Sequence, residues 1–248
     1  MTEILFALGL GNRIVGVTSF CDYPAEAKRK PKVGGMSNPS LEAVISLKPD
    51  VVVMTIDGNP REFEERLRSL GIKTYVFRAR RLSELPQGIR DLGEALGVQE
   101  RAETFAQEFE STLKKVGAEE RRTGTHVPSP KQKALFIVWP EPLIAAGPGT
   151  VIDDALTLIG LDNIASKSLV SYPKYSIEEI IRRAPDVIII GRGMERKDIE
   201  RISAGLLKRL HSVPAVKNKR VFYVSDDLYR LGPRTIRGIE EMSRLVVR

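Results

Sequence analysis

The most constraining feature of this sequence is a segment that occurs twice. Residues 40–54 read SLEAVISLKPDVVVM and residues 176–190 read SIEEIIRRAPDVIII, with six identical positions and apolar exchanges at most of the others. Each copy begins with a serine suited to cap a helix. Ser176 is expected to form a capping box with Glu179, whereas Ser40 lacks the matching glutamate and caps alone. A proline about two turns later is expected to end each helix. The Val/Ile run that follows lacks polar alternation, which is typical of a parallel strand covered on both faces. A repeat at this separation predicts a duplicated α/β domain.

The duplication extends upstream of these segments. Residues 8–12 (LGLGN) resemble residues 159–163 (IGLDN), and each closes an apolar helical run. Gly9 and Gly160 are placed to follow those helices as left-handed caps. A strand at 133–138 is predicted before the second helix, whereas the first half begins directly at its helix. The internal symmetry therefore leads us to expect a further strand upstream of this numbering.

Strands and helices alternate in both halves, which predicts an α/β fold of two Rossmann-like lobes, each with a central parallel sheet. Between the halves, apolar residues recur at steps of three and four, and this periodicity predicts one long connecting helix. We expect an N-terminal lobe at 1–97, the connecting helix at 98–122 and a C-terminal lobe at 123–248. The predicted strands are 13–18, 51–54, 73–77, 133–138, 187–190 and 220–224. The other predicted helices are 61–70, 82–96, 195–210 and one that begins near Pro233. Residues 139–149 are predicted to form a loop.

Composition excludes several classes of protein. The 248 residues carry a formal net charge of +7, but 39 basic residues stand beside 32 acidic ones, mostly mixed along helices. The basic runs lack interleaved aromatic residues, which argues against a nucleic-acid reader. No window is apolar enough for a membrane span, and no signal peptide is visible at Met1. Cys21 is the single cysteine, and His126 and His211 are not spaced as a metal pair, so no intrinsic metal site is expected.

Motifs for catalysis are weak. Gly9-x-Gly11 follows no strand and its third glycine is misplaced, so it fails as a dinucleotide fingerprint. No Ser/His/Asp set can be assembled, and we predict that the chain is not an enzyme. Ligands of open α/β sheets instead bind beyond the carboxyl ends of the strands. The loops expected there carry aromatic, Met and Arg side chains suited to a flat, partly apolar ligand with polar edges: Tyr23, Met36, Thr55, Trp139, Tyr172 and Arg230.

Over nearly its full length the chain resembles class III substrate-binding proteins of ABC transporters, the binders of cobalamin, haem and ferric siderophores. The cobalamin-binding branch is the most similar. The resemblance rests on residues 2–17, Asp22-Tyr23-Pro24, Val33-Gly34-Gly35, residues 39–53, Gly71-Ile72, residues 145–150 and the second repeat segment.

The resemblance implies two lobes that are joined by one helix and hold the ligand between them, and one glutamate per lobe that docks onto arginines of the permease. By position these glutamates are Glu42 and Glu178. For the ligand, Tyr23, Tyr172 and Arg230 fall on pocket positions of the cobalamin binder, with Tyr172 in place of a tryptophan. Met36 and Thr55 also replace tryptophans, which reduces the aromatic area. Family members are exported, so a periplasmic or membrane-anchored extracellular location is implied.

We therefore expect a monomeric protein that captures a corrinoid, delivers it to an ABC permease dimer and has no intrinsic cofactor. The ligand would pack between Tyr23, Trp139 and Tyr172, with Arg230 at a polar edge. Ferric siderophores or haem are the alternative ligands, because the basic balance suits anions. Two further alternatives are a two-domain nucleotide-handling enzyme and a cytosolic chelate carrier without a transporter.

Overall fold

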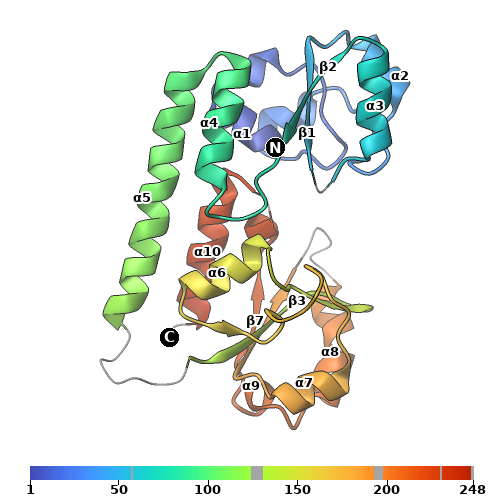
Figure 1. The fold of residues 1–248 in the computed structure, drawn as a ribbon. Coiled ribbons are helices and arrows are strands. Elements are labelled where there is room, and N and C mark those ends of the chain that lie inside the picture. The colour runs from blue at the N-terminus through green and yellow to red at the C-terminus, as the bar shows by residue number, and fades with distance from the viewer. Residues whose placement is uncertain (57, 124–130, 193–197, 230, 247–248) are drawn as a thin grey trace. The chain divides into compact units, whose positions relative to one another are not determined.

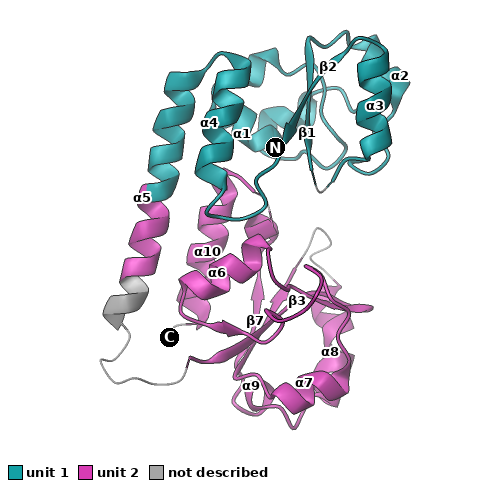
Figure 2. Cartoon of the chain, in the orientation of Figure 1, with its two compact units in different colours: residues 1–110 teal, residues 111–248 magenta. Residues whose placement is uncertain are grey.

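In the computed structural model the chain forms two compact units, residues 1–110 and 111–248, which Figure 2 distinguishes by colour. The structure describes residues 1–56, 58–123, 131–192, 198–229 and 231–246. Each unit contains a β-sheet with helices packed on it, so the predicted α/β class is confirmed (Figure 1).

Unit 1 is built on a parallel pair of strands, β1 (Val51–Thr55) and β2 (Lys73–Phe77). One face of the pair packs on α2 (Leu41–Ser46) and α3 (Arg61–Ser69) through Val44, Met54, Phe63 and Leu67. The helix α3 buries only its apolar stripe and exposes its arginines, as an amphipathic helix should. The remaining elements are α1 (Thr2–Ala7), η1 (Gly11–Arg13), η2 (Ala25–Arg29) and α4 (Leu85–Leu96).

The long helix α5 spans Gln99–Thr123, and the boundary between the two units falls within it. Its first part is fixed to α4 inside unit 1 by Arg90. That guanidinium donates from Nε to Glu103 at 2.7 Å and from Nη1 to Glu110 at 2.8 Å. The hydrogen bonds to Glu103 and then to Glu110 raise the pKa of Arg90 further above its ordinary value.

Unit 2 has a five-stranded sheet in which β3 (Lys133–Pro140) and β6 (Val187–Gly191) are central. β3, β6 and β7 (Val221–Val224) are parallel, β5 (Asp162–Asn163) pairs β3 in parallel, and β4 (Leu143–Ala145) pairs β3 antiparallel. One face packs on α7 (Ile177–Arg183), α8 (Ile199–Arg209) and α9 (Pro214–Lys217). In Figure 1 the helices α6 (Val151–Leu158) and α10 (Pro233–Val246) lie on the other side, where η3 (Asp226–Tyr229) adjoins α10.

The two repeat segments fold alike. Ser40 and Ser176 are the N-caps of α2 and α7, and each hydroxyl accepts from the backbone N–H three residues on. Upstream, Gly9 and Gly160 follow α1 and α6 with φ angles of 73° and 77°, the left-handed backbone that glycine adopts at little cost. The predicted caps of all four helices are thus confirmed.

Several sequence-based expectations are wrong in detail. Residues 13–18 form no strand, because Gly11–Arg13 make a 3-10 turn and Val17 contributes only one bridge to Lys32. The predicted loop 139–149 contains β4, which makes the second sheet mixed instead of wholly parallel. β6 is buried along its whole length, but β1 is only partly covered, since its described sheet has two strands.

Among the described residues, no helix is both long enough and apolar enough to cross a lipid bilayer.

Candidate functional site

Two of the predicted ligand residues of unit 1, Met36 and Thr55, are held together by the side chain of Asn59. The Asn59 Oδ1 accepts from the Thr55 backbone N–H at 2.9 Å, and its Nδ2 donates to the Met36 carbonyl at 3.0 Å. The Met36 thioether lies over Gly58, where an added Cβ would come within 2.3 Å of the sulfur. A single amide thus fixes the loop at the carboxyl end of β1. Asn59 is not among the residues that the sequence analysis identified.

Tyr23, the third predicted ligand residue of unit 1, precedes a cis peptide bond to Pro24. Its ring is partly exposed. The preceding turn is closed by the backbone N–H of Cys21, which donates to the Thr18 carbonyl. An aromatic side chain is therefore presented to solvent from an irregular loop.

In unit 2 the structure brings Trp139 and Tyr172 onto neighbouring segments. Trp139 of β3 is opposite Ile144 of β4, and Ile144 forms a bridge with Lys174. The loop that carries Tyr172 is fastened to the β4 segment by backbone hydrogen bonds on both sides, Gly147 N–H to the Ser171 carbonyl at 2.8 Å and Ala145 N–H to the Pro173 carbonyl at 3.0 Å.

Both rings remain open to solvent. Trp139 is 38% exposed and Tyr172 is 55% exposed, although apolar rings gain free energy from burial. The indole Nε1 of Trp139 donates to the Glu141 carbonyl at 2.6 Å, which fixes the ring. Two large rings on a hydrogen-bonded framework form a preorganised apolar contact surface.

Tyr229, which is not among the predicted ligand residues, is partly buried. Its ring packs edge-on against Phe136 with centroids 5.9 Å apart, and its hydroxyl is buried without a hydrogen-bond partner among the described residues. Burial raises the pKa of this phenol well above its ordinary value. The hydroxyl occupies the space above Gly191, where any Cβ would collide with it. The neighbouring Arg230, a predicted ligand residue, lies outside the described residues.

The predicted docking residue Glu42 lies in the first turn of α2. Its Oε2 accepts a hydrogen bond of 3.1 Å from the Ser40 hydroxyl, which itself accepts from the Ala43 N–H. Its own backbone N–H and then the Ser40 hydroxyl lower the pKa of the Glu42 carboxyl. The helix N-terminus favours the same negative charge. Glu42 is exposed and therefore available to a cation from outside the chain.

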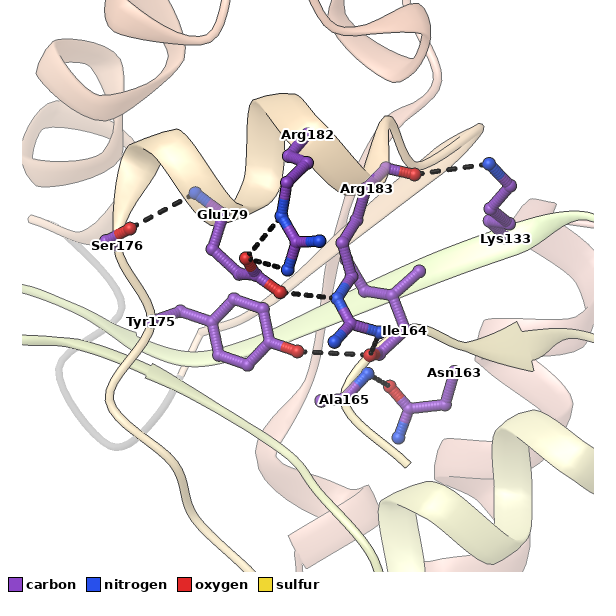
Figure 3. Close-up of polar contacts among 9 residues, drawn as sticks. All are labelled: Lys133, Asn163, Ile164, Ala165, Tyr175, Ser176, Glu179, Arg182 and Arg183. Atoms are coloured by element: carbon purple, nitrogen blue, oxygen red, sulfur yellow. Dashed lines mark hydrogen bonds and ion pairs between the residues drawn. The ribbon is translucent and has the colours of Figure 1, made fainter. Parts of the chain in front are cut away.

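Glu178 occupies the equivalent position in α7 and is also exposed. Its backbone N–H and then the Ser176 hydroxyl lower the pKa of its carboxyl in the same order of importance. The adjacent Glu179 is different, as Figure 3 shows, because both of its oxygens are used inside the unit. Oε1 accepts from Arg183 Nε at 2.6 Å and Oε2 from Arg182 Nε at 2.9 Å.

This use of Glu179 corrects the expected capping box, in which its carboxylate would return to Ser176. The carboxylate instead orients Arg183, whose Nη1 donates to the Ile164 carbonyl at 3.0 Å. The Tyr175 hydroxyl donates to the same carbonyl at 3.0 Å (Figure 3). These contacts fasten α7 to the segment after β5 and leave Glu178 outside the network.

Within the described ranges, no group of three or more His, Cys, Asp or Glu side chains is arranged to hold a metal ion. The predicted ligand residues carry aromatic, thioether and hydroxyl groups, which are suited to contact an organic ligand and not to bind a bare cation.

Two α/β units that each present exposed aromatic side chains are typical of a two-lobed binding protein. Residues 1–228 match the family model described as "Periplasmic binding protein", and the chain belongs to that family. The predictions of a transport binding protein and of no enzymatic activity are thereby confirmed, as is the resemblance on which they rest.

Named relatives agree with this membership. The chain is 33% identical over 251 residues to an uncharacterised ABC transporter substrate-binding lipoprotein, YvrC of Bacillus subtilis, covering 99% of this chain and 76% of the relative. It is 31% identical to the vitamin B12-binding protein of Pectobacterium atrosepticum, covering 79% of this chain and 70% of that protein.

Two solved structures share the fold. The periplasmic vitamin B12-binding protein BtuF of Vibrio cholerae superposes with a TM-score of 0.83 at 25% identity, covering 99% of this chain and 92% of its own. The periplasmic haem-binding protein RhuT of Roseiflexus sp. RS-1, in apo form, gives 0.85 at 28% identity, with coverages of 99% and 94%.

Proposed function

We propose that this protein captures a bulky, flat metal chelate, a corrinoid in the first place, outside the cytoplasmic membrane. The observation that carries the proposal is the pair of exposed rings, Trp139 and Tyr172, held on a hydrogen-bonded framework at one edge of the unit 2 sheet. Burying such rings against an apolar ligand face supplies affinity without a large ordering cost. Relatives named as vitamin B12-binding proteins support this class of ligand, and a relative named as a lipoprotein supports the location.

The remaining predicted ligand residues have secondary roles in this proposal. Tyr23 offers a third ring, while Met36 offers a polarizable side chain that adapts to an irregular surface. Thr55 supplies a hydroxyl beside the Asn59 amide. Arg230 would meet a polar edge of the ligand. Because Met36 and Thr55 carry no aromatic ring, the proposal favours a ligand that makes part of its contacts with unit 1 through polar groups.

Haem or a ferric siderophore is the second candidate class of ligand. The net charge of +7 favours an anionic chelate, whereas a corrinoid presents mainly neutral amides. The similarity to the haem-binding protein RhuT supports the same alternative.

Isothermal titration of the full chain with cyanocobalamin, dicyanocobinamide, haemin and a ferric catecholate siderophore separates these candidates. Corrinoid binding with little or no haemin binding supports the first proposal, and the reverse result supports the second. The variants Trp139→Ala and Tyr172→Ala are each expected to lower the affinity for the ligand by about tenfold, because each removes one aromatic ring from the contact surface. Failure of all four ligands to bind would rule out both classes.

We further propose that the protein acts as a monomer and that Glu42 and Glu178 dock it onto basic residues of an ABC permease dimer. The support is that both carboxylates are exposed, occupy equivalent helix positions and have pKa values lowered by the same kinds of contact. Complementary charge mainly sets orientation and the rate of encounter. Glu42→Lys with Glu178→Lys should abolish uptake in cells while ligand affinity is kept. Normal uptake by the double variant would exclude this role.

A further inference from the structure

An isoleucine stands three residues after each predicted docking glutamate, and both isoleucines are open to solvent. Ile45 of α2 is 41% exposed and Ile181 of α7 is 42% exposed. Residues three apart on a helix are surface neighbours, so each isoleucine shares a face with its glutamate. Each repeat helix therefore presents one carboxylate and one branched apolar side chain together.

This exposure is repeated residue by residue. Along 41–47 and 177–183 the order of burial is the same, with one buried position, Val44 or Ile180, directly before the exposed isoleucine. The pattern is maintained although the neighbouring residues differ, since unit 1 has Ala43 where unit 2 has Glu179. The helices are therefore seated alike in the two units, and they turn the same pair of side chains outward.

Folding gives no reason for an apolar residue at these two positions. A β-branched side chain is a poorer helix former than the straight-chain polar residues, and an exposed isoleucine recovers only part of its transfer free energy. A single exposed apolar residue needs no explanation. Two of them at equivalent positions, each beside an exposed carboxylate of lowered pKa, indicate a shared contact with something outside the chain.

The chemistry of the face identifies its partner. The exposed carboxylates favour a cationic partner. In unit 2 the adjacent Arg182 and Arg183 are bound to Glu179 (Figure 3), and Arg209 lowers the pKa of Glu178 less than the Ser176 hydroxyl does, so the exposed Glu178 carboxylate remains available to a cation from outside. The exposed isoleucines favour a partner with an apolar surface next to that cation, against which they can be buried. The duplication calls for a partner that offers the same arrangement twice, as a symmetric dimer does.

We propose that Ile45 and Ile181 are docking residues that insert beside Glu42 and Glu178 into apolar depressions of the permease dimer, each depression being flanked by an arginine or lysine. This inference rests on the docking role proposed above and extends it. The glutamates set the orientation through charge, and the isoleucines supply buried apolar area that lengthens the life of the complex.

The test measures binding of the full chain, ligand-free, to the importer of the same cell reconstituted in lipid nanodiscs. The variants are Ile45→Ser, Ile181→Ser and the double variant. Matched controls are Leu70→Ser in unit 1 and Leu245→Ser in unit 2. Both leucines are exposed, Leu70 as the C-cap residue of α3 and Leu245 in the last turn of α10. Each single isoleucine variant should weaken docking roughly fivefold and the double variant roughly twentyfold, with a faster dissociation rate. The thermal midpoint and the ligand affinity should not change, and Ile45→Leu should restore docking.

Docking of the isoleucine variants equal to that of the leucine controls would overturn the inference. A fall in thermal midpoint equal to the loss of docking would also overturn it, because the isoleucines would then be structural. If Glu42→Lys and Glu178→Lys still weaken docking in either case, the proposed docking role stands without the isoleucines. If the glutamate variants also dock normally, the docking role itself is excluded.

Discussion

Lys48 and Ala184 adopt the same left-handed backbone, with φ angles of 46° and 47°. Lys48 lies just beyond the end of α2, and Ala184 is the C-cap of α7. Each directly precedes a proline, Pro49 or Pro185, which restricts the backbone of the residue before it. A side chain with a Cβ pays a steric cost in this region, and glycine is the residue that usually occupies it. The duplicated segment thus keeps a strained turn in both units.

Glycine at these turns should stabilise the protein. We expect Lys48→Gly and Ala184→Gly each to raise the free energy of unfolding by about 0.5 kcal/mol, because relief of the left-handed strain exceeds the added entropy of the unfolded chain. Denaturant unfolding measures this change. Ala204→Gly in the interior of α8 is the control, and it should lower stability by about 1 kcal/mol. A loss of stability in both turn variants would contradict the prediction.

The carboxylates of the proposed docking residues Glu42 and Glu178 should keep their charge at acidic pH. Since the pKa values of Glu42 and Glu178 are lowered, their contribution to stability is present above the ordinary glutamate pKa and is lost as pH falls through the lower folded values. Replacing Ser40 by Ala removes a donor to Glu42 and should raise its pKa toward the ordinary value. NMR titration of the side-chain carboxyl carbons measures both groups. Glu178 is the internal control, and a shift of its pKa in Ser40→Ala would contradict the assignment.

The polar network on α7 should depend on Glu179 and Arg183 more than on Arg182. Arg183→Ala removes the guanidinium from the Ile164 carbonyl and is expected to lower the free energy of unfolding by about 1 kcal/mol, with Tyr175 still bonded to that carbonyl. Arg182→Ala removes a more exposed ion pair with the same carboxylate and should cost at most about 0.5 kcal/mol. Chemical denaturation compares the two, and equal losses would show that the Ile164 contact contributes nothing.

The buried hydroxyl of Tyr229 should be dispensable for folding. Tyr229→Phe removes a buried polar atom without a described partner and keeps the ring against Phe136, so stability should be unchanged or rise by up to about 1 kcal/mol. Gly191→Ala is the converse test. Its new Cβ would overlap the Tyr229 hydroxyl, and a loss of about 1–3 kcal/mol is expected. Thermal unfolding of both variants checks the pair, and a large loss in Tyr229→Phe would reveal an unseen partner for the hydroxyl.

Much of the architecture follows from local sequence. The caps at Ser40 and Ser176, the glycines after α1 and α6, and the apolar stripe of α5 each depend on interactions within a few residues, which composition and spacing specify directly. The strand expected at residues 13–18 fails for the opposite reason. A strand requires a partner elsewhere in the chain, and Val17 finds only the single bridge to Lys32.

The sequence alone therefore determined the duplication, the helix ends, the class of fold and the candidate aromatic residues, because these are encoded in short-range patterns. Only the tertiary structure decided that Asn59 joins Met36 to Thr55 and that the loop carrying Tyr172 is hydrogen-bonded to the β4 segment. It also decided that Glu179 is bound by arginines within unit 2, whereas Glu178 and Ile181 are exposed to solvent. The physical reason is that the environment of a side chain depends on residues distant in sequence. Two adjacent glutamates can therefore differ, one bound to partners within the unit and the other exposed to solvent.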